Sequence, residues 1–199
     1  MNIFKKIFGN FSSSGKENND EGGKYLPEKE IPVDELFMKN FKSNGGKFLY
    51  CENEEELNEN LISILQENDW FEIEALSFEK ELYHFLQENK LHYKNPRNPI
   101  FFLASCEGLI AQDGAVLFSS KQLLHYKTNE LPKNIIVISR ASQITRSKSD
   151  GLRNIKMKYG NEIPTNITTI QLFKENVADD FLQYGIPSKN FYLLLLEDF

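Results

Sequence analysis

Apolar residues recur along the chain with two spacings, one typical of β-strands and one typical of α-helices. Short apolar or alternating runs of strand type occupy residues 47–51, 70–77, 100–104, 134–139, 167–172 and 191–196. Helices are predicted between them at residues 33–44, 53–68, 78–89, 147–159 and 175–184. Because strands that alternate with helices are typical of α/β proteins, we expect a three-layer α/β sandwich with a mostly parallel sheet.

Capping residues mark the ends of several predicted helices. Asn53 with Glu56, and Ser147 with Asp150, have the three-residue spacing of an N-terminal capping arrangement. A pair of glycines at 45–46 follows the apolar positions of the first helix, where a left-handed cap is common. These residues place helix starts at 53 and 147 and a helix end near 45.

The segment 103–122, LASCEGLIAQDGAVLFSSKQ, is the most informative part of the chain. Two short apolar runs flank the Asp113-Gly114 dipeptide, and this pattern predicts a strand, a turn and a second strand. Asp113 is explained most simply by the turn itself. Glu107 follows the 100–104 strand, where it would be either an acidic group of a site at the strand's carboxyl end or a cap for a turn or helix.

The first 24 residues differ in composition from the rest. Residues 12–24 contain no apolar side chain and predict a flexible linker. Residues 1–11 carry apolar side chains at helical spacing, so they form either a helix that contacts a membrane surface or a partner, or a tail that is unstructured in isolation. We expect a single folded domain over residues 25–199.

Composition narrows the classes of function. The 199 residues carry a net charge of −6, which disfavours nucleic-acid binding through bulk electrostatics. No apolar run is long enough for a transmembrane segment, and the first residues do not have the pattern of a secretory signal. We therefore expect a cytoplasmic protein.

The chain has two cysteines and three histidines. Cys51 and Cys106 are far apart and are predicted to be small buried residues rather than a disulfide. None of the histidines has another histidine or cysteine at ligand spacing. We therefore predict no metal site and no bound cofactor.

Common catalytic and nucleotide-binding motifs do not occur. The sequence contains neither a dinucleotide fingerprint nor a P-loop, and it lacks the GxSxG nucleophile motif. Ser119 and Ser120 lack a histidine and an acid in a recognisable constellation, so we expect them to be surface hydroxyls at a strand end.

Basic residues are concentrated between Lys121 and Lys158. This segment holds nine basic residues and only two acidic ones, a local charge of +7 within a chain of −6. Such asymmetry indicates either an anion-binding patch or a solvated basic face that keeps the protein soluble. Arg140 and Arg146 are the strongest candidates for anion contacts, because they flank the end of the 134–139 strand, where α/β sheets bind ligands.

The order of several short motifs resembles the LUD-domain family, typified by lactate-utilisation protein C. The motifs are FMKNFKSNGGKFLYC at 37–51, CEGLIAQDGAVLFSS at 106–120, LPKNIIVISRASQI at 131–144, IPTNITTI at 163–170 and GIPSKNFYLLLLED at 185–198. The resemblance implies an α/β sandwich like that of sugar-phosphate isomerases and CoA transferases. It also implies a part in L-lactate oxidation alongside iron–sulfur partner proteins.

The chain departs from the family pattern at two places. It has Gln112-Asp113-Gly114 where members usually have Glu-Thr-Gly, and 171–174 read QLFK where members have a Gly-Pro-Ser stretch. CoA transferases with a similar fold use a glutamate just before such a turn as a nucleophile. The amide of Gln112 cannot form an acyl anhydride, so covalent CoA transfer is disfavoured.

Two hypotheses follow. The first is a LUD-type protein that binds a small anionic metabolite and assists oxidation of L-lactate or a related hydroxy acid. The second is a non-catalytic assembly subunit whose apolar N-terminal segment and basic face bind a protein partner. The first hypothesis predicts ligand contacts, with Glu107 as a catalytic candidate, at Glu107, Gln112, Asp113, Gly114, Lys121, Arg140 and Arg146.

Overall fold

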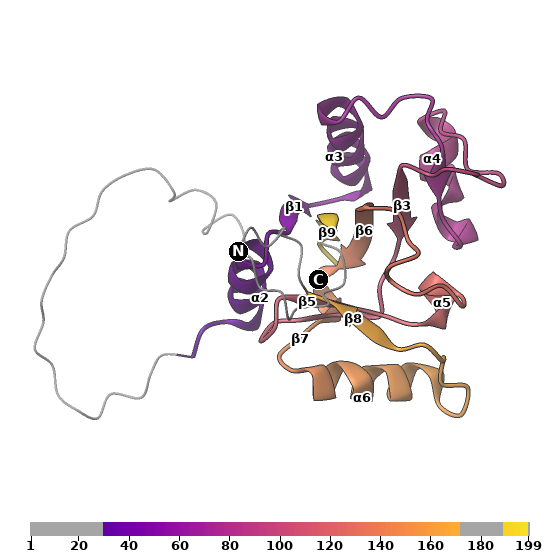
Figure 1. Ribbon diagram of the computed structural model, residues 1–199. Helices are drawn as coiled ribbons and strands as arrows, with labels where there is room; N and C mark the ends of the chain where they lie inside the picture. Colours follow the sequence, from indigo (N-terminus) through magenta and orange to yellow (C-terminus); the bar gives the residue numbers. More distant parts are fainter. Residues whose placement is uncertain (1–29, 172–188, 199) are drawn as a thin grey trace, which may run out of the picture. The chain divides into compact units, whose positions relative to one another are not determined.

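A five-stranded sheet in which every neighbouring pair is parallel forms the centre of the domain. The computed structural model describes residues 30–171 and 189–198 (Figure 1). In spatial order the strands are β1 (Lys47–Cys51), β9 (Asn190–Leu196), β6 (Asn134–Arg140), β3 (Phe101–Ala104) and β2 (Ala75–Leu76). The predicted α/β class with a mostly parallel sheet is confirmed.

A second, four-stranded sheet was not expected from the sequence. Its spatial order is β7 (Ile144–Thr145), β4 (Gly108–Ile110), β5 (Ala115–Phe118) and β8 (Thr168–Ile170). β4 and β5 form the predicted hairpin around Asp113-Gly114, and β8 pairs antiparallel with β5. The strand predicted at 167–172 therefore extends the hairpin and does not join the main sheet.

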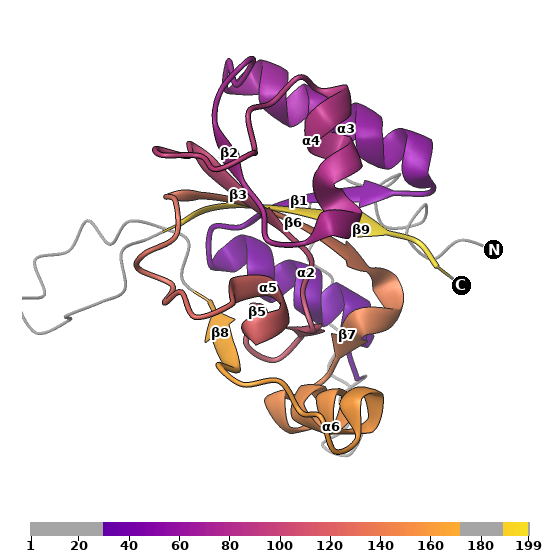
Figure 2. The same cartoon turned by 90° about the vertical axis from the view of Figure 1, so that its right-hand side faces the viewer.

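Helices cover the parallel sheet on both faces. Figure 2 shows α3 (Glu54–Glu67) and α4 (Tyr83–Glu88) on one face and α2 (Val33–Ser43) and α5 (Ser120–Leu123) on the other. α6 (Lys148–Tyr159) lies beyond the second sheet. Most buried apolar residues form one cluster beneath α3 and α4 and another between the parallel sheet and the hairpin. A smaller third cluster lies between the second sheet and α6.

Local capping explains where the helices begin. The Asn53 side chain accepts a hydrogen bond from the Glu56 N–H at 2.9 Å, and the Glu56 carboxylate accepts one from the Glu52 N–H. At α6, Ser147 and Asp150 form a complete capping box. The predicted starts of both helices are confirmed.

The strand predicted at 70–77 is wrong over most of its length. Only Ala75–Leu76 forms β2, because Glu72 adopts a left-handed backbone conformation with φ 53° and interrupts the extended chain. Trp70 instead packs against Phe101, with their rings 5.3 Å apart. The helix predicted after it is divided into a 3₁₀ turn, η1 (Lys80–Leu82), and the short α4.

Both cysteines are buried and free, as the sequence predicted. Burial raises the pKa of Cys51 to about 11 and that of Cys106 to about 12, so both are protonated thiols at neutral pH. In 30–171 and 189–198, no helix has the length and apolar character needed to cross a bilayer. The predicted N-terminal segment and linker, the domain start at Tyr25 and the helix at 175–184 lie outside the described residues.

Candidate functional site

Polar side chains gather beyond the carboxyl end of β3, around the carboxylate of Glu107. Glu107 lies between β3 and β4, and its backbone N–H donates to the Leu117 carbonyl of β5 at 2.8 Å. The hairpin thus carries Glu107 into the interior, where its side chain has 0% exposed surface. A buried carboxylate requires several hydrogen-bond donors, and the neighbouring elements supply them.

Four side chains donate to this carboxylate. The Ser119 hydroxyl lies 2.7 Å away and the Gln122 amide 3.2 Å away. The Lys158 ammonium is 3.1 Å from Oε2, and the Tyr159 hydroxyl is 3.0 Å from Oε1. Together with Glu79 and Ser105, described next, these residues are named the Glu107 cluster.

A second carboxylate lies beside the first. Ser105 follows β3 directly, and both its hydroxyl and its N–H, the latter at 2.7 Å, donate to Glu79. The Gln122 amide is 3.5 Å from the Ser105 hydroxyl oxygen, so Ser105 and Gln122 connect the two carboxyl groups. Glu79 and Ser105 are only partly buried, so this side of the cluster faces solvent.

The local folds that hold the cluster are well defined. Ser119 is the N-cap of α5 and forms a capping box with Gln122, which places both side chains over Glu107. Lys158 and Tyr159 belong to the last turn of α6, which packs on the second sheet through Ile155. The cluster therefore joins a strand end, a helix start and a helix end.

The two carboxyl groups have oppositely shifted pKa values. Burial alone would raise the pKa of Glu107, but hydrogen bonds from Ser119 and Lys158 outweigh it, and the net pKa is lowered. Burial raises the pKa of Glu79 in spite of its bonds from Ser105, and the charge of Glu107 adds to the effect. Paired carboxyl groups whose pKa values are driven apart are suited to different roles, one as a fixed anion and one as a proton carrier.

Exposed positive charges lie next to the cluster. The ammonium of Lys121 is 5.7 Å from the centre of the Tyr159 ring, and that of Lys158 is 4.9 Å from it. Arg140 ends β6 and is exposed, and its N–H donates to Gln143, whose amide in turn donates to the Cys106 carbonyl at 2.8 Å. Lys121 and Arg140 therefore present cations at the carboxyl edge of the parallel sheet.

The other predicted ligand residues lie at the opposite end of the hairpin. The turn of Gln112, Asp113 and Gly114 rests on α2, where the Asn40 amide donates to the Gln112 carbonyl at 3.0 Å and the Asn44 amide to the Asp113 carbonyl at 2.7 Å. The Gln112 and Asp113 side chains are exposed.

Arg146 belongs to this second group. Its carbonyl accepts a hydrogen bond from the Gln112 N–H at 3.0 Å, and its guanidinium reaches the Ile31 carbonyl at 3.5 Å. Five residues of near-extended chain separate Glu107 from Gln112, or about 17 Å. The structure thus groups Glu107 with Lys121, near the strand end that bears Arg140, and holds Arg146 with the turn.

Sequence reasoning missed most of the Glu107 cluster. It did not single out Glu79, Ser105, Gln122, Lys158 or Tyr159. The expectation that Ser119 is a surface hydroxyl is wrong, because Ser119 is fully buried. Its spacing from Gln122 matches a capping box and was the one local signal for this part of the site.

Among the described residues, no group of three or more histidine, cysteine, aspartate or glutamate side chains could hold a metal ion. The Glu107 cluster instead offers hydroxyl, amide and ammonium donors around carboxylates. These donors are directed at the Glu107 and Glu79 carboxyl groups.

A family model described as the LUD domain matches residues 35–196. The chain belongs to the LUD-domain family. This family is associated with lactate utilisation. No protein of curated function matches the sequence of this LUD domain.

A solved structure supports the fold. The LUD domain is similar to the crystal structure of a DUF162 family protein from Deinococcus radiodurans, with a TM-score of 0.60 and 11% sequence identity. The similarity covers 83% of this chain and 96% of the other. At this identity the comparison shows a shared fold, and the further likeness to sugar-phosphate isomerases and CoA transferases stays a prediction.

Proposed function

We propose that this LUD domain binds a small hydroxy-acid anion of the L-lactate class at the solvent side of the Glu107 cluster and assists its oxidation. The observation that carries the proposal is the pairing of two carboxyl groups of divergent pKa with the neighbouring cations at the carboxyl edge of the sheet. This edge is where open α/β sheets usually bind ligands.

Each part of a hydroxy acid has a matching group. The ligand carboxylate would pair with the ammonium of Lys121, assisted by Arg140. The hydroxyl would donate to Glu79, whose raised pKa makes its carboxylate a stronger proton acceptor than an ordinary glutamate. Glu107 is enclosed by its own partners, so its part in this proposal is to hold Ser119, Gln122 and Lys158 in place.

Oxidation of a hydroxy acid to a keto acid removes two electrons and two protons. Glu79 would accept the hydroxyl proton as the O–H bond breaks. The α-hydrogen would leave with both electrons as a hydride, to a hydride acceptor carried by a partner protein of a lactate-oxidation system, which would pass the electrons on to its iron–sulfur centres. The proposal includes no covalent intermediate between the protein and the substrate. Gln112 offers no nucleophilic carboxylate, and its side chain lies at the far turn of the hairpin.

Calorimetric titration with L-lactate and with propionate, which lacks the hydroxyl, tests the proposal. We expect Lys121→Ala to weaken binding of both acids about tenfold. Glu79→Gln should weaken lactate binding about tenfold and leave propionate binding nearly unchanged, because only lactate has a hydroxyl to bind.

Two control variants locate the ligand. Arg146→Ala, at the α2 end of the hairpin, and Lys156→Ala, on the exposed face of α6, should leave both affinities within twofold. If Arg146→Ala weakens binding and Lys121→Ala does not, the ligand lies at the turn and the proposal is wrong. A thermal-shift screen with CoA esters, sugar phosphates and folates extends the test, since a ligand other than a hydroxy acid would also overturn it.

The alternative function is a non-catalytic assembly subunit, favoured by the outer face of α6. Leu152 and Met157 are 40% and 76% exposed there, among the basic residues Lys148, Arg153 and Lys156. A basic face with exposed apolar side chains suits an acidic protein partner. Capture of a partner that is lost in Met157→Glu, together with no binding of any small acid, would support this function over the first.

A further inference from the structure

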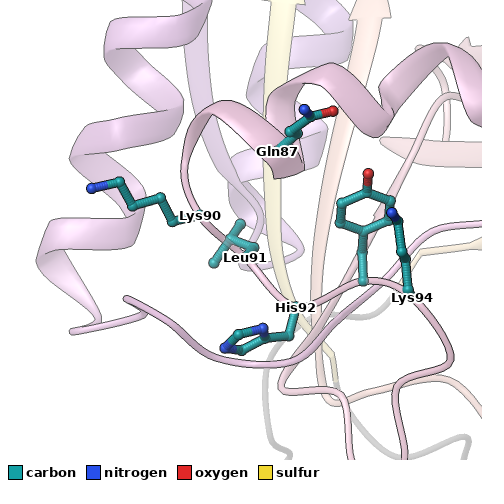
Figure 3. Close-up of a pocket in the computed structure, with 6 residues that line it drawn as sticks. Gln87, Lys90, Leu91, His92 and Lys94 are labelled. Carbon is teal, nitrogen blue, oxygen red and sulfur yellow. The ribbon is translucent and has the colours of Figure 1, made fainter.

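A second candidate site lies at the opposite edge of the parallel sheet, where strands β2 and β3 begin. It is formed by the segment that leads from α4 to β3. The cavity has a volume of about 380 Å³ and is lined by Gln87, Lys90, Leu91, His92, Tyr93 and Lys94. We name it the 87–94 pocket. Figure 3 shows Lys90 and Lys94 on opposite sides of Leu91.

The pocket is separate from the Glu107 cluster. Its backbone lies beside the entries to β2 and β3, because the Ala75 N–H donates to the His92 carbonyl at 3.0 Å and the Ile100 N–H donates to the Glu74 carbonyl at 2.8 Å. Ser105 of the Glu107 cluster lies beyond the other end of β3. Five residues of extended chain, about 16 Å, separate Ile100 from Ser105.

Hydrogen bonds hold the walls of the pocket in place. The Leu91 N–H donates to the Leu86 carbonyl at 2.9 Å, and the His92 N–H donates to the Ile73 carbonyl at 2.9 Å. The ring of Tyr93 packs on that of Tyr83, with 4.9 Å between their centres. A ligand would therefore meet a largely preformed surface, which lowers the entropy cost of binding.

The polar groups of the pocket have no partners among the described residues. No hydrogen bond or ion pair is made by the side chains of Lys90, Lys94, His92 or Gln87 with residues 30–171 or 189–198. No acidic side chain lines the pocket. The nearby carboxylate of Glu74 is occupied, since it accepts the N–H groups of Arg97 and Asn98.

The backbone of Lys90 adds a second observation. Lys90 follows the last turn of α4 with φ 56°, in the left-handed region where glycine or asparagine is the usual residue. Glycine would adopt this backbone conformation with less strain than lysine does. A lysine at this position places a cation at the rim of the pocket.

We propose that the 87–94 pocket binds a small phosphate monoester. Two lysines act as mobile point charges, which suits the tetrahedral, doubly charged phosphate, whereas planar carboxylates are matched best by the arginine fork that the pocket lacks. Gln87 and His92 supply further polar contacts at the rim. The half-buried Tyr93 ring, fixed against Tyr83, forms an apolar surface for the organic part of the ester.

Two-dimensional amide NMR of the full chain, titrated with phenyl phosphate and separately with inorganic phosphate, tests the proposal. We expect saturable shifts confined to residues 87–94 and their strand neighbours, with phenyl phosphate bound more tightly than inorganic phosphate. Shifts centred on Lys121 and Arg140, or shifts that do not saturate, would overturn it.

The variant Lys90→Gly, combined with Lys94→Gln, separates binding from folding. Glycine relieves the left-handed conformation, so thermal stability should be equal or higher, while the affinity for phenyl phosphate should fall at least tenfold. Lys148→Gln with Lys156→Gln, which removes the same charge from α6, should leave that affinity within twofold. Equal losses in the two double variants would show a general charge effect and contradict the site.

Discussion

The two ends of the β4–β5 hairpin are stabilised in different ways, although only a few residues separate them. At one end the buried Glu107 carboxylate is held by side chains from α5 and α6. At the other end the turn at Gly114 is held through its backbone, by the side-chain amides of Asn40 in α2 and of Asn44, the C-cap of α2. The first end depends on charge, and the second on backbone geometry and close approach.

This difference bears on where a ligand can bind. The Glu107 end faces solvent through ionisable groups whose charges can respond to a substrate. At the turn the backbone carbonyls already accept hydrogen bonds from side-chain amides, and the turn residues determine the conformation of the turn. Although Gln112 and Glu107 are close in sequence, the extended strand separates them, so a site built on one does not include the other.

The largest effect is expected at the turn. In Gly114→Ala the new Cβ would lie 2.4 Å from the Asn40 carbonyl carbon and from the Phe41 nitrogen, with φ at 57°. Backbone atoms cannot move aside as a flexible side chain would, so we expect a loss of about 4 kcal/mol in the free energy of unfolding. Urea denaturation measures it.

Gly160→Ala is the matched control for this change. Gly160 has the same φ of 57°, but no atom lies within 4 Å of the added Cβ. Only the left-handed conformation is then penalised, by about 1 kcal/mol. Equal losses at the two glycines would show that close approach to α2 does not stabilise the turn.

The next effect is expected at the charged end. Glu107→Gln removes the charge that pairs with Lys158, and the amide cannot accept all four donors, so we expect a loss of about 2 kcal/mol at neutral pH. Glu67→Gln breaks the exposed ion pair with Lys47, whose two side chains are 46% and 60% exposed, and should cost less than about 0.5 kcal/mol.

The charged end should also depend on pH, unlike the turn. Because the pKa of Glu107 is lowered in the folded state, its stabilisation is present above the ordinary value of 4.5 and is lost as the pH falls through the lowered pKa. The difference between wild type and Glu107→Gln should therefore shrink in acid, while the Gly114→Ala difference should not. A constant Glu107→Gln difference from pH 7 to pH 3 would contradict the role given to its charge.

The smallest effect is expected for the amide contacts of α2. Asn40→Ala loses hydrogen bonds to the carbonyls of Ala111 and Gln112, at 2.8 and 3.0 Å, for about 1 kcal/mol. Lys39→Ala, at an exposed neighbouring position of the same helix, should change stability by less than about 0.5 kcal/mol. A loss at Asn40 no larger than at Lys39 would mean that backbone packing alone holds the turn.

The sequence predicted features that depend on neighbouring residues. The hairpin at Asp113-Gly114 and the caps at Asn53 and Ser147 each follow from residues within a few positions, because turn and cap geometry is local. The LUD-domain family was also recognised from the order of short motifs, and the family model confirms it.

Features built from distant residues were not predicted. Lys158 is 51 residues from Glu107 and Glu79 is 26 residues from Ser105, and no periodic pattern connects them. The second sheet was missed for the same reason, since β8 pairs with a hairpin formed some fifty residues earlier. The prediction of a strand at 70–77 was wrong because Glu72 takes a positive φ. A positive φ is uncommon for residues other than glycine, so the sequence does not indicate it.

The position of β9 constrains the order in which this domain can be assembled. β9 lies between β1 and β6, so the first strand of the sheet reaches the others only through residues 190–196. During synthesis, β1 is made before its partner β9. Its hydrogen-bonded ladder cannot form until nearly 140 further residues have been translated. Such long-range parallel pairing slows folding, and it makes the integrity of the whole sheet depend on the seven residues of β9.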